Sequence, residues 1–302
     1  MNLSVLSARR LAIGFTLFSA LIMGGCSSTA NYPTGSLNGL PVAEPHPTRF
    51  AYEFELAKLN EVLGQELDAE QRGQLLYRRG ALYDLMGLRT LARIDLNHAL
   101  EYQPRNADAY NILGIHYTVL GETQYAFDAL DAAIELAPNH EFAYLNRGIA
   151  AYYGGRIDLA TQDMQRFLAA DASDPYRILW LYFAEAATDP KAALTALRQR
   201  AQQVNRAEWA HTIVLALAEQ GSEVAFLQEI PRHAGLDPES LDERELRERI
   251  AERLCEAYFY FGKAAQLRGD DARAELYFKL ALSTNVVEFV EHRYAAVELA
   301  RQ

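Results

Sequence analysis

The sequence repeats a pattern of small residues at intervals of 34 positions. In each of three consecutive windows a glycine is followed seven residues later by a second glycine, and five residues after that by an alanine. The same pattern returns once near the C-terminus. These positions are Gly80, Gly87 and Ala92; Gly114, Gly121 and Ala126; Gly148, Gly155 and Ala160; and Gly262, Gly269 and Ala274. With only 18 glycines in the chain, this regular order is not a matter of chance. The pattern therefore indicates a repeated structural unit.

A period of 34 residues with this arrangement of small residues is typical of the tetratricopeptide repeat, a pair of antiparallel helices. The first glycine and the alanine allow the two helices to approach closely, while the second glycine supplies the positive φ at which the first helix ends. The sequence therefore predicts an all-α superhelix of stacked helix pairs, whose concave face is suited to binding other proteins. The predicted repeats span residues 73–106, 107–140, 141–174 and 255–288.

Residues outside these frames also favour helices. An additional helix is expected over 49–64, and Asp68 with Gln71 predicts a capping box at the start of the first repeat. Residues 175–254 lack the glycine pattern but keep helical periodicity, which indicates degenerate helix pairs. A capping helix is expected over 286–299, as the end of a solenoid requires. No run of alternating residues predicts a sheet, so 49–302 is interpreted as one solenoid domain.

The N-terminal residues 1–25 have the composition of a signal peptide. Arg9 and Arg10 precede an apolar run of about fifteen residues, which is too short to span a bilayer and fits a signal-peptide core. Small residues directly before Cys26 resemble a bacterial lipobox, which predicts N-acyl and S-diacylglycerol groups on Cys26. Ser27 resembles the sorting signal for the outer membrane. The alternative is an ordinary signal peptide cleaved near Gly25.

Residues 26–48 are rich in proline and glycine and show no apolar periodicity. We therefore expect a flexible tether with neither helix nor strand, which holds the folded body away from the membrane.

Charge and cysteine content exclude some classes of function. The net charge is −11, and removal of 1–25 with its two arginines changes it to −11 − 2 = −13. Such an acidic body does not suit nucleic acid, which requires basic patches. With Cys26 lipidated, Cys255 has no partner for a disulfide within the chain, and we interpret it as a small packed residue at the start of a helix.

No catalytic motif stands out in the sequence. The histidines have no zinc-site spacing, and neither a P-loop nor a G-x-S-x-G turn occurs. Acidic pairs such as Asp270-Asp271 are typical of solvated surfaces. We therefore expect a protein that is not an enzyme and that needs no metal and no cofactor besides its lipid.

The first helix of each repeat is expected to line the concave groove. The candidate protein-binding residues on these helices are Tyr77, Asp84, Asn111, Ile115, Thr118, Phe142, Leu145, Ile149, Tyr152, Phe259 and Lys263. The third repeat is the most apolar, and such a stripe can bind a partner's helix or extended segment. Alternatively, a neighbouring helix, from 175–254 or from a second protomer, covers the stripe.

Several stretches of the chain form specific motifs. They are Gln74-Leu75-Leu76-Tyr77, Arg79-Gly80, Leu82-Tyr83-Asp84, Leu88-Arg89, Leu91-Ala92-Arg93, Leu145-Asn146-Arg147-Gly148-Ile149-Ala150, Tyr152-Tyr153-Gly154-Gly155-Arg156, Leu179-Trp180-Leu181-Tyr182 and Phe289-Val290-Glu291-His292-Arg293-Tyr294-Ala295. Through these stretches the chain resembles, over nearly all of 50–300, the NlpI family of Gram-negative outer-membrane lipoproteins.

This resemblance implies a homodimeric adaptor that is held in the outer membrane by its lipid and faces the periplasm. The implied partners are a tail-specific protease of the Prc type, a peptidoglycan endopeptidase of the MepS type and other wall enzymes. The implied function is regulation of cell-wall turnover and division. A second hypothesis is a tetratricopeptide lipoprotein that assembles an outer-membrane machine, such as a pilus secretin or the β-barrel insertase. An enzyme of wall metabolism is a remote third.

Overall fold

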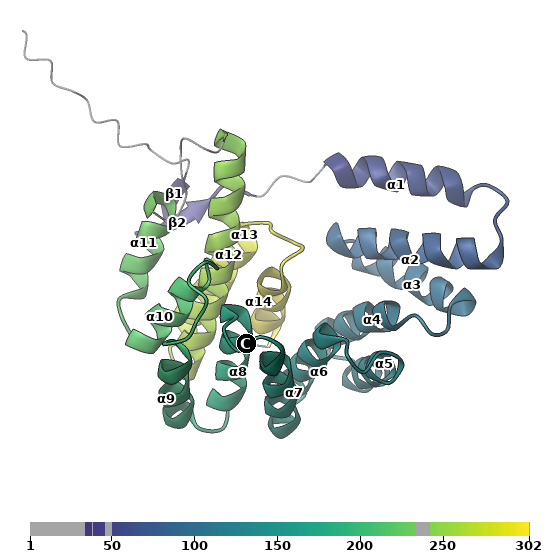
Figure 1. Ribbon diagram of the computed structural model, residues 1–302. Coiled ribbons are helices and arrows are strands. Elements are labelled where there is room, and N and C mark those ends of the chain that lie inside the picture. Colours follow the sequence, from purple (N-terminus) through teal and green to yellow (C-terminus); the bar gives the residue numbers. More distant parts are fainter. Residues whose placement is uncertain (1–33, 38, 46–49, 234–241, 302) are drawn as a thin grey trace, which may run out of the picture. The chain divides into compact units, whose positions relative to one another are not determined.

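The structure is a computed structural model that describes residues 34–37, 39–45, 50–233 and 242–301 (Figure 1). The signal peptide and Cys26 lie outside these residues, which all belong to the compact unit formed by 32–302. The described part holds fourteen helices and one two-stranded hairpin, so the all-α fold of stacked helix pairs is confirmed.

Most consecutive helices pack against each other as antiparallel pairs. The strongest contacts join α2 to α3, α4 to α5, α6 to α7 and α12 to α13, which are the four repeats expected from the glycine pattern. The additional helix α1 (Phe50–Leu63) precedes the helices of the first three repeats, which are α2 (Ala69–Leu85), α3 (Arg89–Tyr102), α4 (Ala107–Leu120), α5 (Thr123–Leu136), α6 (Glu141–Tyr153) and α7 (Ile157–Ala170). The remaining helices are α8 (Pro175–Ala186), α9 (Pro190–Arg200), α10 (His211–Glu219), α11 (Glu223–His233), α12 (Glu243–Leu267), α13 (Asp271–Ser283) and α14 (Val290–Ala300).

The first glycine of each repeat faces a large side chain of the second helix. A Cβ atom added at Gly114 would lie 2.4 Å from Cγ of Leu130, and one at Gly262 would lie 2.6 Å from Cε1 of Phe278. Gly80 has the same relation to Leu96. Only a residue without a side chain leaves room for this approach, which explains the 34-residue spacing. The second glycine of each repeat ends its helix with φ between +74° and +75°.

The predicted helix starts are present. Asp68 and Gln71 form the expected capping box, and Asn106 accepts a hydrogen bond from the backbone N–H of Ala109. The carboxylates of Asp174 and Asp189 cap α8 and α9, each followed by proline at the first helical position.

Two expectations about secondary structure were wrong. Part of the predicted tether forms a hairpin, in which β1 (Thr34–Leu37) pairs antiparallel with β2 (Leu40–Ala43). Leu40 and Ala43 are buried, and the Tyr258 hydroxyl donates to the carbonyl oxygen of Pro41 at 2.6 Å. The sequence dipeptide Asn38-Gly39 is a strong hairpin signal that the proline content of this segment concealed.

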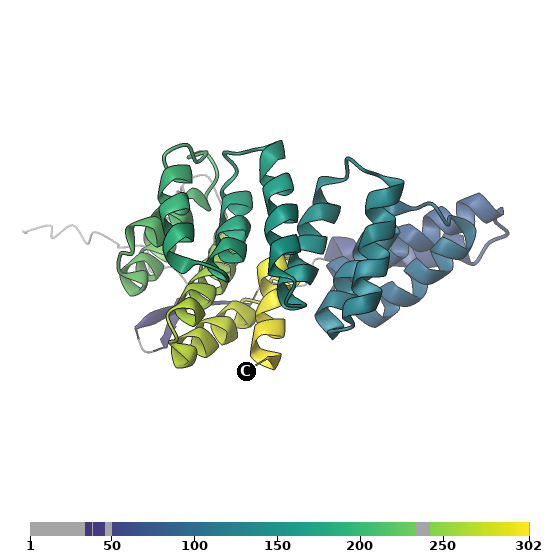
Figure 2. The ribbon, with the colours of Figure 1, turned by 90° about the horizontal axis from the view of Figure 1, so that it is seen from below.

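The second error concerns the start of the last repeat. The predicted charged helix of 238–254 and the first helix of that repeat form one continuous 25-residue helix, α12. Cys255 therefore lies inside a helix and is fully buried. Side chains of α8, α10, α11, α13 and α14 pack around α12, which makes this helix the centre of the larger hydrophobic core (Figure 2).

Enlarging a repeat glycine is expected to separate the helix pair. Gly114→Val should lower the free energy of unfolding by roughly 1–3 kcal/mol, because the added methyl groups overlap Leu130. Urea titration followed by circular dichroism measures this change. Gly221→Val is the matched control, since no atom lies within 4 Å of a Cβ added there. Equal losses in the two variants would contradict this account of the repeat.

Candidate functional site

The C-terminal helix α14 covers the face on which the candidate binding residues lie. Its Tyr294 ring stacks on Tyr153 with centroids 5.2 Å apart and meets Trp180 edge-on at 6.2 Å. Because Tyr153 belongs to α6 and Trp180 to α8, α14 joins the third repeat to the degenerate segment. The cover over the third repeat therefore comes from the chain's own last helix, together with α8 (Figure 2).

Buried charges hold α14 in this position. Lys263 of α12 donates to Glu298 of α14 and, at 2.9 Å, to the hydroxyl oxygen of Tyr152. Glu298 also accepts from the Tyr153 hydroxyl at 2.8 Å. Lys263 and Glu298 are only 4% and 3% exposed. Burial alone lowers the pKa of Lys263, but Tyr152 and Glu298 outweigh it and leave that pKa raised, so the ammonium stays charged.

A second buried contact links α14 to the first repeat. One guanidinium nitrogen of Arg293, Nη2, lies 3.0 Å from both carboxylate oxygens of Asp84, and Nε2 of His116 lies 2.7 Å from one of them. Burial raises the pKa of Asp84, but His116 and Arg293 outweigh it, and the net shift is downward. Burial lowers the pKa of His116 despite the neighbouring carboxylate. His116 is therefore neutral at pH 7 and donates its Nε2–H to Asp84.

The candidate groove residues differ in how far they are buried. Asp84, Asn111, Thr118, Leu145, Ile149, Phe259 and Lys263 are buried, and Tyr77, Ile115 and Tyr152 are half-buried. The side-chain amide of Asn111 accepts from Asn146, and the Thr118 hydroxyl donates to the Gly114 carbonyl. Phe142 alone in this set is exposed, at 55%. In this arrangement most of the apolar stripe faces the interior of the chain.

Exposed apolar side chains lie instead on the second helices and turns of the first two repeats. We call Leu88, Leu91, Ile94, Leu120 and Tyr125 the outer row; each is between 41% and 61% exposed. Leu91 and Tyr125 are 34 residues apart and occupy the same position in consecutive repeats. Leu88, Leu91 and Ile94 follow each other at intervals of three, which places them on one side of α3 and its N-terminal turn. Neighbouring exposed apolar side chains make the outer row a candidate contact surface.

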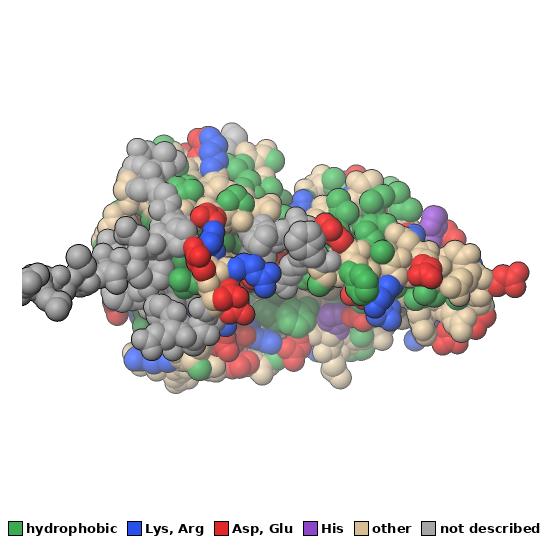
Figure 3. Space-filling view, turned by 90° about the horizontal axis from the view of Figure 1, so that it is seen from above, with side chains coloured by type: hydrophobic (Ala, Val, Ile, Leu, Met, Phe, Trp, Pro, Cys, Tyr) green, Lys and Arg blue, Asp and Glu red, His purple; other side chains and the backbone are tan. Residues whose placement is uncertain are grey.

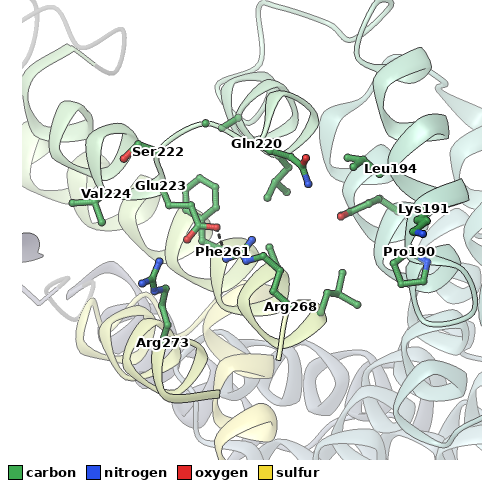
Figure 4. Close-up of a pocket in the computed structure, with 16 residues that line it drawn as sticks. Pro190, Lys191, Leu194, Gln220, Ser222, Glu223, Val224, Phe261, Arg268 and Arg273 are labelled. Atoms are coloured by element: carbon green, nitrogen blue, oxygen red, sulfur yellow. Dashed lines mark hydrogen bonds and ion pairs between the residues drawn. The ribbon is translucent and has the colours of Figure 1, made fainter. Parts of the chain in front are cut away.

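A pocket lies in another part of the fold, between α9, α10, α11 and α12 (Figure 4). It has a volume of about 470 Å³. Its apolar wall includes Leu194, Leu217 and Phe261. Lys191, Arg268 and Arg273 bring positive charge to its edge, and Arg268 forms an ion pair with Glu223 at 2.7 Å. Apolar walls with a cationic edge suit a protein segment that carries both aliphatic and acidic side chains.

A second pocket of about 500 Å³ lies beside the N-terminal half of α12. Its wall includes Glu256, a carboxylate that accepts hydrogen bonds from Trp209 Nε1 and, at 2.9 Å, from the Tyr176 hydroxyl. Burial and the nearby carboxylate of Glu291 raise the pKa of Glu256 well above its usual value, despite these two donors. Burial beside Glu291 explains the raised pKa, and the other carboxylates that line this pocket, Glu245, Glu248 and Glu252, belong to the same helix as Glu256.

Within the described residues no group of three or more histidine, cysteine, aspartate or glutamate side chains could hold a metal ion. No helix among the residues with described coordinates is long and apolar enough to cross a membrane. No protein-family model matches the chain.

Sequence reasoning missed both the outer row and the pocket. The repeat pattern identifies which positions face the partner helix, but it does not identify the element that covers the remaining face. Leu91 and Tyr125 could have been found by comparing apolar residues at equivalent positions of the second helices. The pocket depends on how α9, α10, α11 and α12 pack together, which the helical periodicity of 175–254 does not specify.

Removing the charge of Lys263 is expected to release α14. Lys263→Met leaves the Glu298 carboxylate buried without its cation, and the free energy of unfolding should fall by about 3–5 kcal/mol. Urea titration measures the loss. The control is Lys279→Met, because Lys279 pairs with Glu275 on the exposed face of α13 and should change stability by less than about 1 kcal/mol. Lys263→Met combined with Glu298→Leu should recover most of the loss; failure to recover would contradict the proposed pairing.

The buried carboxylate of Glu256 is expected to make stability depend on pH. Its folded-state pKa is raised, so the folded protein keeps a proton that the unfolded chain has lost. The stability that this proton contributes is fully present below the pKa of Glu256 in the unfolded chain. It is lost as the pH rises through the pKa of Glu256 in the folded protein. From pH 5 to pH 8 the melting temperature of the wild type should therefore fall relative to that of Glu256→Gln. Parallel curves for the two proteins would contradict the shift.

Proposed function

We propose that this protein is a non-catalytic, lipid-anchored adaptor that brings peptidoglycan hydrolases to a tail-specific protease and so regulates cell-wall turnover and division. The observation that carries the proposal is the presence of two separate contact surfaces on one repeat scaffold. The outer row occupies the first two repeats, and the pocket lies between α9, α10, α11 and α12. An adaptor must hold two proteins at once, so it requires at least two surfaces that do not overlap.

The concave face that α14 covers, called the inner face below, is closed. This supports placing the two partners on the outer row and at the pocket. Binding there would first require α14 to leave, which would expose Lys263 and Glu298 without their partners at a cost of several kcal/mol. The outer row and the pocket need no such rearrangement. They differ in chemistry, since the outer row is apolar and the pocket edge is cationic. Two partners with different surfaces can therefore bind without competing.

The proposed mechanism requires no chemistry from the adaptor itself. When protease and hydrolase are bound to one scaffold, cleavage becomes a reaction between neighbours, and the effective concentration rises without new contacts between them. Lipidation at Cys26 confines the assembly to the membrane surface. Strand β2 packs against α11 and α12, so the hairpin fixes the end of the predicted tether to the folded body.

The expected outcome of deleting the gene is accumulation of a MepS-type endopeptidase, measured by its half-life after translation is stopped. Complementation with the wild type should restore degradation. An unchanged half-life in the deletion strain would contradict the adaptor function. Loss of secretin multimers with unchanged endopeptidase would favour the assembly-factor hypothesis instead.

Variants of the two surfaces should separate the two partners. Leu91→Asp with Tyr125→Asp alters the outer row, and Lys191→Glu with Arg273→Glu reverses charge at the pocket. In pull-downs from membranes, each double variant is expected to recover at least tenfold less of one partner and an unchanged amount of the other. Because these side chains are at the surface, the melting temperature should stay within a few degrees of that of the wild type.

Phe54→Asp and Lys279→Glu are the controls, since both residues are exposed and lie outside the two surfaces. Full binding of both partners by both double variants would contradict the two-surface arrangement.

A further inference from the structure

Buried polar atoms without a hydrogen-bond partner are concentrated in one place. Among the described residues six such side-chain atoms occur, and five surround the junction of α14 with the first two repeats. These five are Arg89 Nε, His116 Nδ1, His292 Nδ1, Arg293 Nε and Tyr294 Oη. The Arg293 and His116 side chains meet at Asp84, and Arg89 is close enough to Arg293, Asp84 and Tyr294 to interact electrostatically with all three. His292 interacts in the same way with Arg89 and Arg293.

This cluster carries more positive than negative charge. Its guanidinium groups belong to Arg89 and Arg293. Asp84 is the carboxylate beside them, and Arg293 and His116 already share it. Burial lowers the pKa of both His116 and His292, so neither histidine adds charge at pH 7. Two guanidinium groups beside one carboxylate leave positive charge in excess at this place in an acidic chain.

The excess is costly without a further anion. Arg293 is 5% exposed and His116 is fully buried, so water compensates little of their polarity. Arg89 forms no hydrogen bond and no ion pair with any described residue. Burial, together with repulsion from Arg293, lowers its pKa. Polar groups that are buried in native proteins nearly always have partners, and a cluster of exceptions points to a ligand or ion.

The two unpartnered guanidinium nitrogens, Arg89 Nε and Arg293 Nε, are the atoms that indicate the kind of ligand. A guanidinium group presents Nε and Nη in a planar fork that matches the oxygens of a carboxylate or phosphate. His116 donates Nε2–H to Asp84, and His292 donates Nε2–H to the Leu282 carbonyl, so each Nδ1 is an acceptor. The Tyr294 hydroxyl can donate or accept. We propose that Arg89 and Arg293 bind a small oxyanion, a phosphate or carboxylate group, at this junction.

The position of the site gives the anion a structural consequence. Arg89 is the first residue of α3, and Arg293 lies in α14, so an anion shared by both joins the first repeat to the C-terminal helix. In Figure 3 the surface is hollowed between the part of the molecule around α2 and the part around α12, with histidine and hydrophobic side chains visible in the hollow. The anion has a route to the site from solvent, because the Arg89 side chain is only partly buried.

The test is calorimetric titration of the full-length chain, in detergent micelles, with sodium phosphate and with sodium acetate at constant ionic strength. Saturable binding of at least one anion is expected, and Arg89→Gln should weaken it at least tenfold. Arg78→Gln is the matched control, because Arg78 is an exposed arginine of α2 whose partner is Glu55. Absence of saturable binding, or equal binding by the two variants, would overturn the proposal.

Thermal melts separate anion binding from a purely structural role of Arg89. In chloride buffer Arg89→Gln should melt no lower than wild type, because the substitution removes an unpaired charge. Phosphate should raise the melting temperature of the wild type and of Arg78→Gln but not of Arg89→Gln. If Arg89→Gln instead melts lower in both buffers by the same amount, Arg89 has only a structural role and the proposal fails.

Peptides identify the source of the oxyanion. A short peptide with a free C-terminal carboxylate is titrated beside the same peptide with an amidated C-terminus. Binding of the free form alone assigns the site to the end of a polypeptide. Binding of phosphate without either peptide assigns it to a small inorganic oxyanion.

Discussion

The close approach of paired helices is the constraint on which the rest of the structure depends. Gly114 and Gly262 leave space that Leu130 and Phe278 fill, and the same arrangement brings α2 against α3. Once each pair has this geometry, consecutive pairs can stack only along one direction, and their first helices share one face. Burying the apolar residues of that face removes them from water, and most of them are buried in this chain.

The chain covers this face with its own C-terminal helix, and the contacts that hold it are largely polar. Ion pairs between Lys263 and Glu298 and between Arg293 and Asp84 are buried at the same interface. Buried ion pairs contribute little net stability, but their geometry is specific. A purely apolar helix could slide along the face, whereas two ion pairs at opposite ends of α14 fix both its position and its orientation. The inner face is therefore closed in one defined way.

Most of the repeats could be predicted from the sequence because their constraint is local. A glycine and the residue it faces lie sixteen positions apart, as with Gly114 and Leu130, so one sequence window contains both partners. The same holds for the caps at Asp68 and Asn106. The cover over the inner face could not be predicted, because Lys263 and Tyr152 are 111 residues apart and nothing local pairs them. The hairpin was missed for a different reason, since Asn38-Gly39 lies among prolines that favour irregular structure.

The closed inner face changes where partners of such a scaffold can bind. A groove that is open in solution offers one long surface, and two partners would compete for it. With α14 in place, the residues of the outer row remain exposed, and the cationic pocket lies in the region of α9 to α12. Arg89 begins the same helix that carries Leu91 and Ile94, and it interacts electrostatically with Arg293 of α14. An anion bound there would stabilise the helix that presents the outer row, so occupancy of the junction and the rigidity of that binding surface are physically linked.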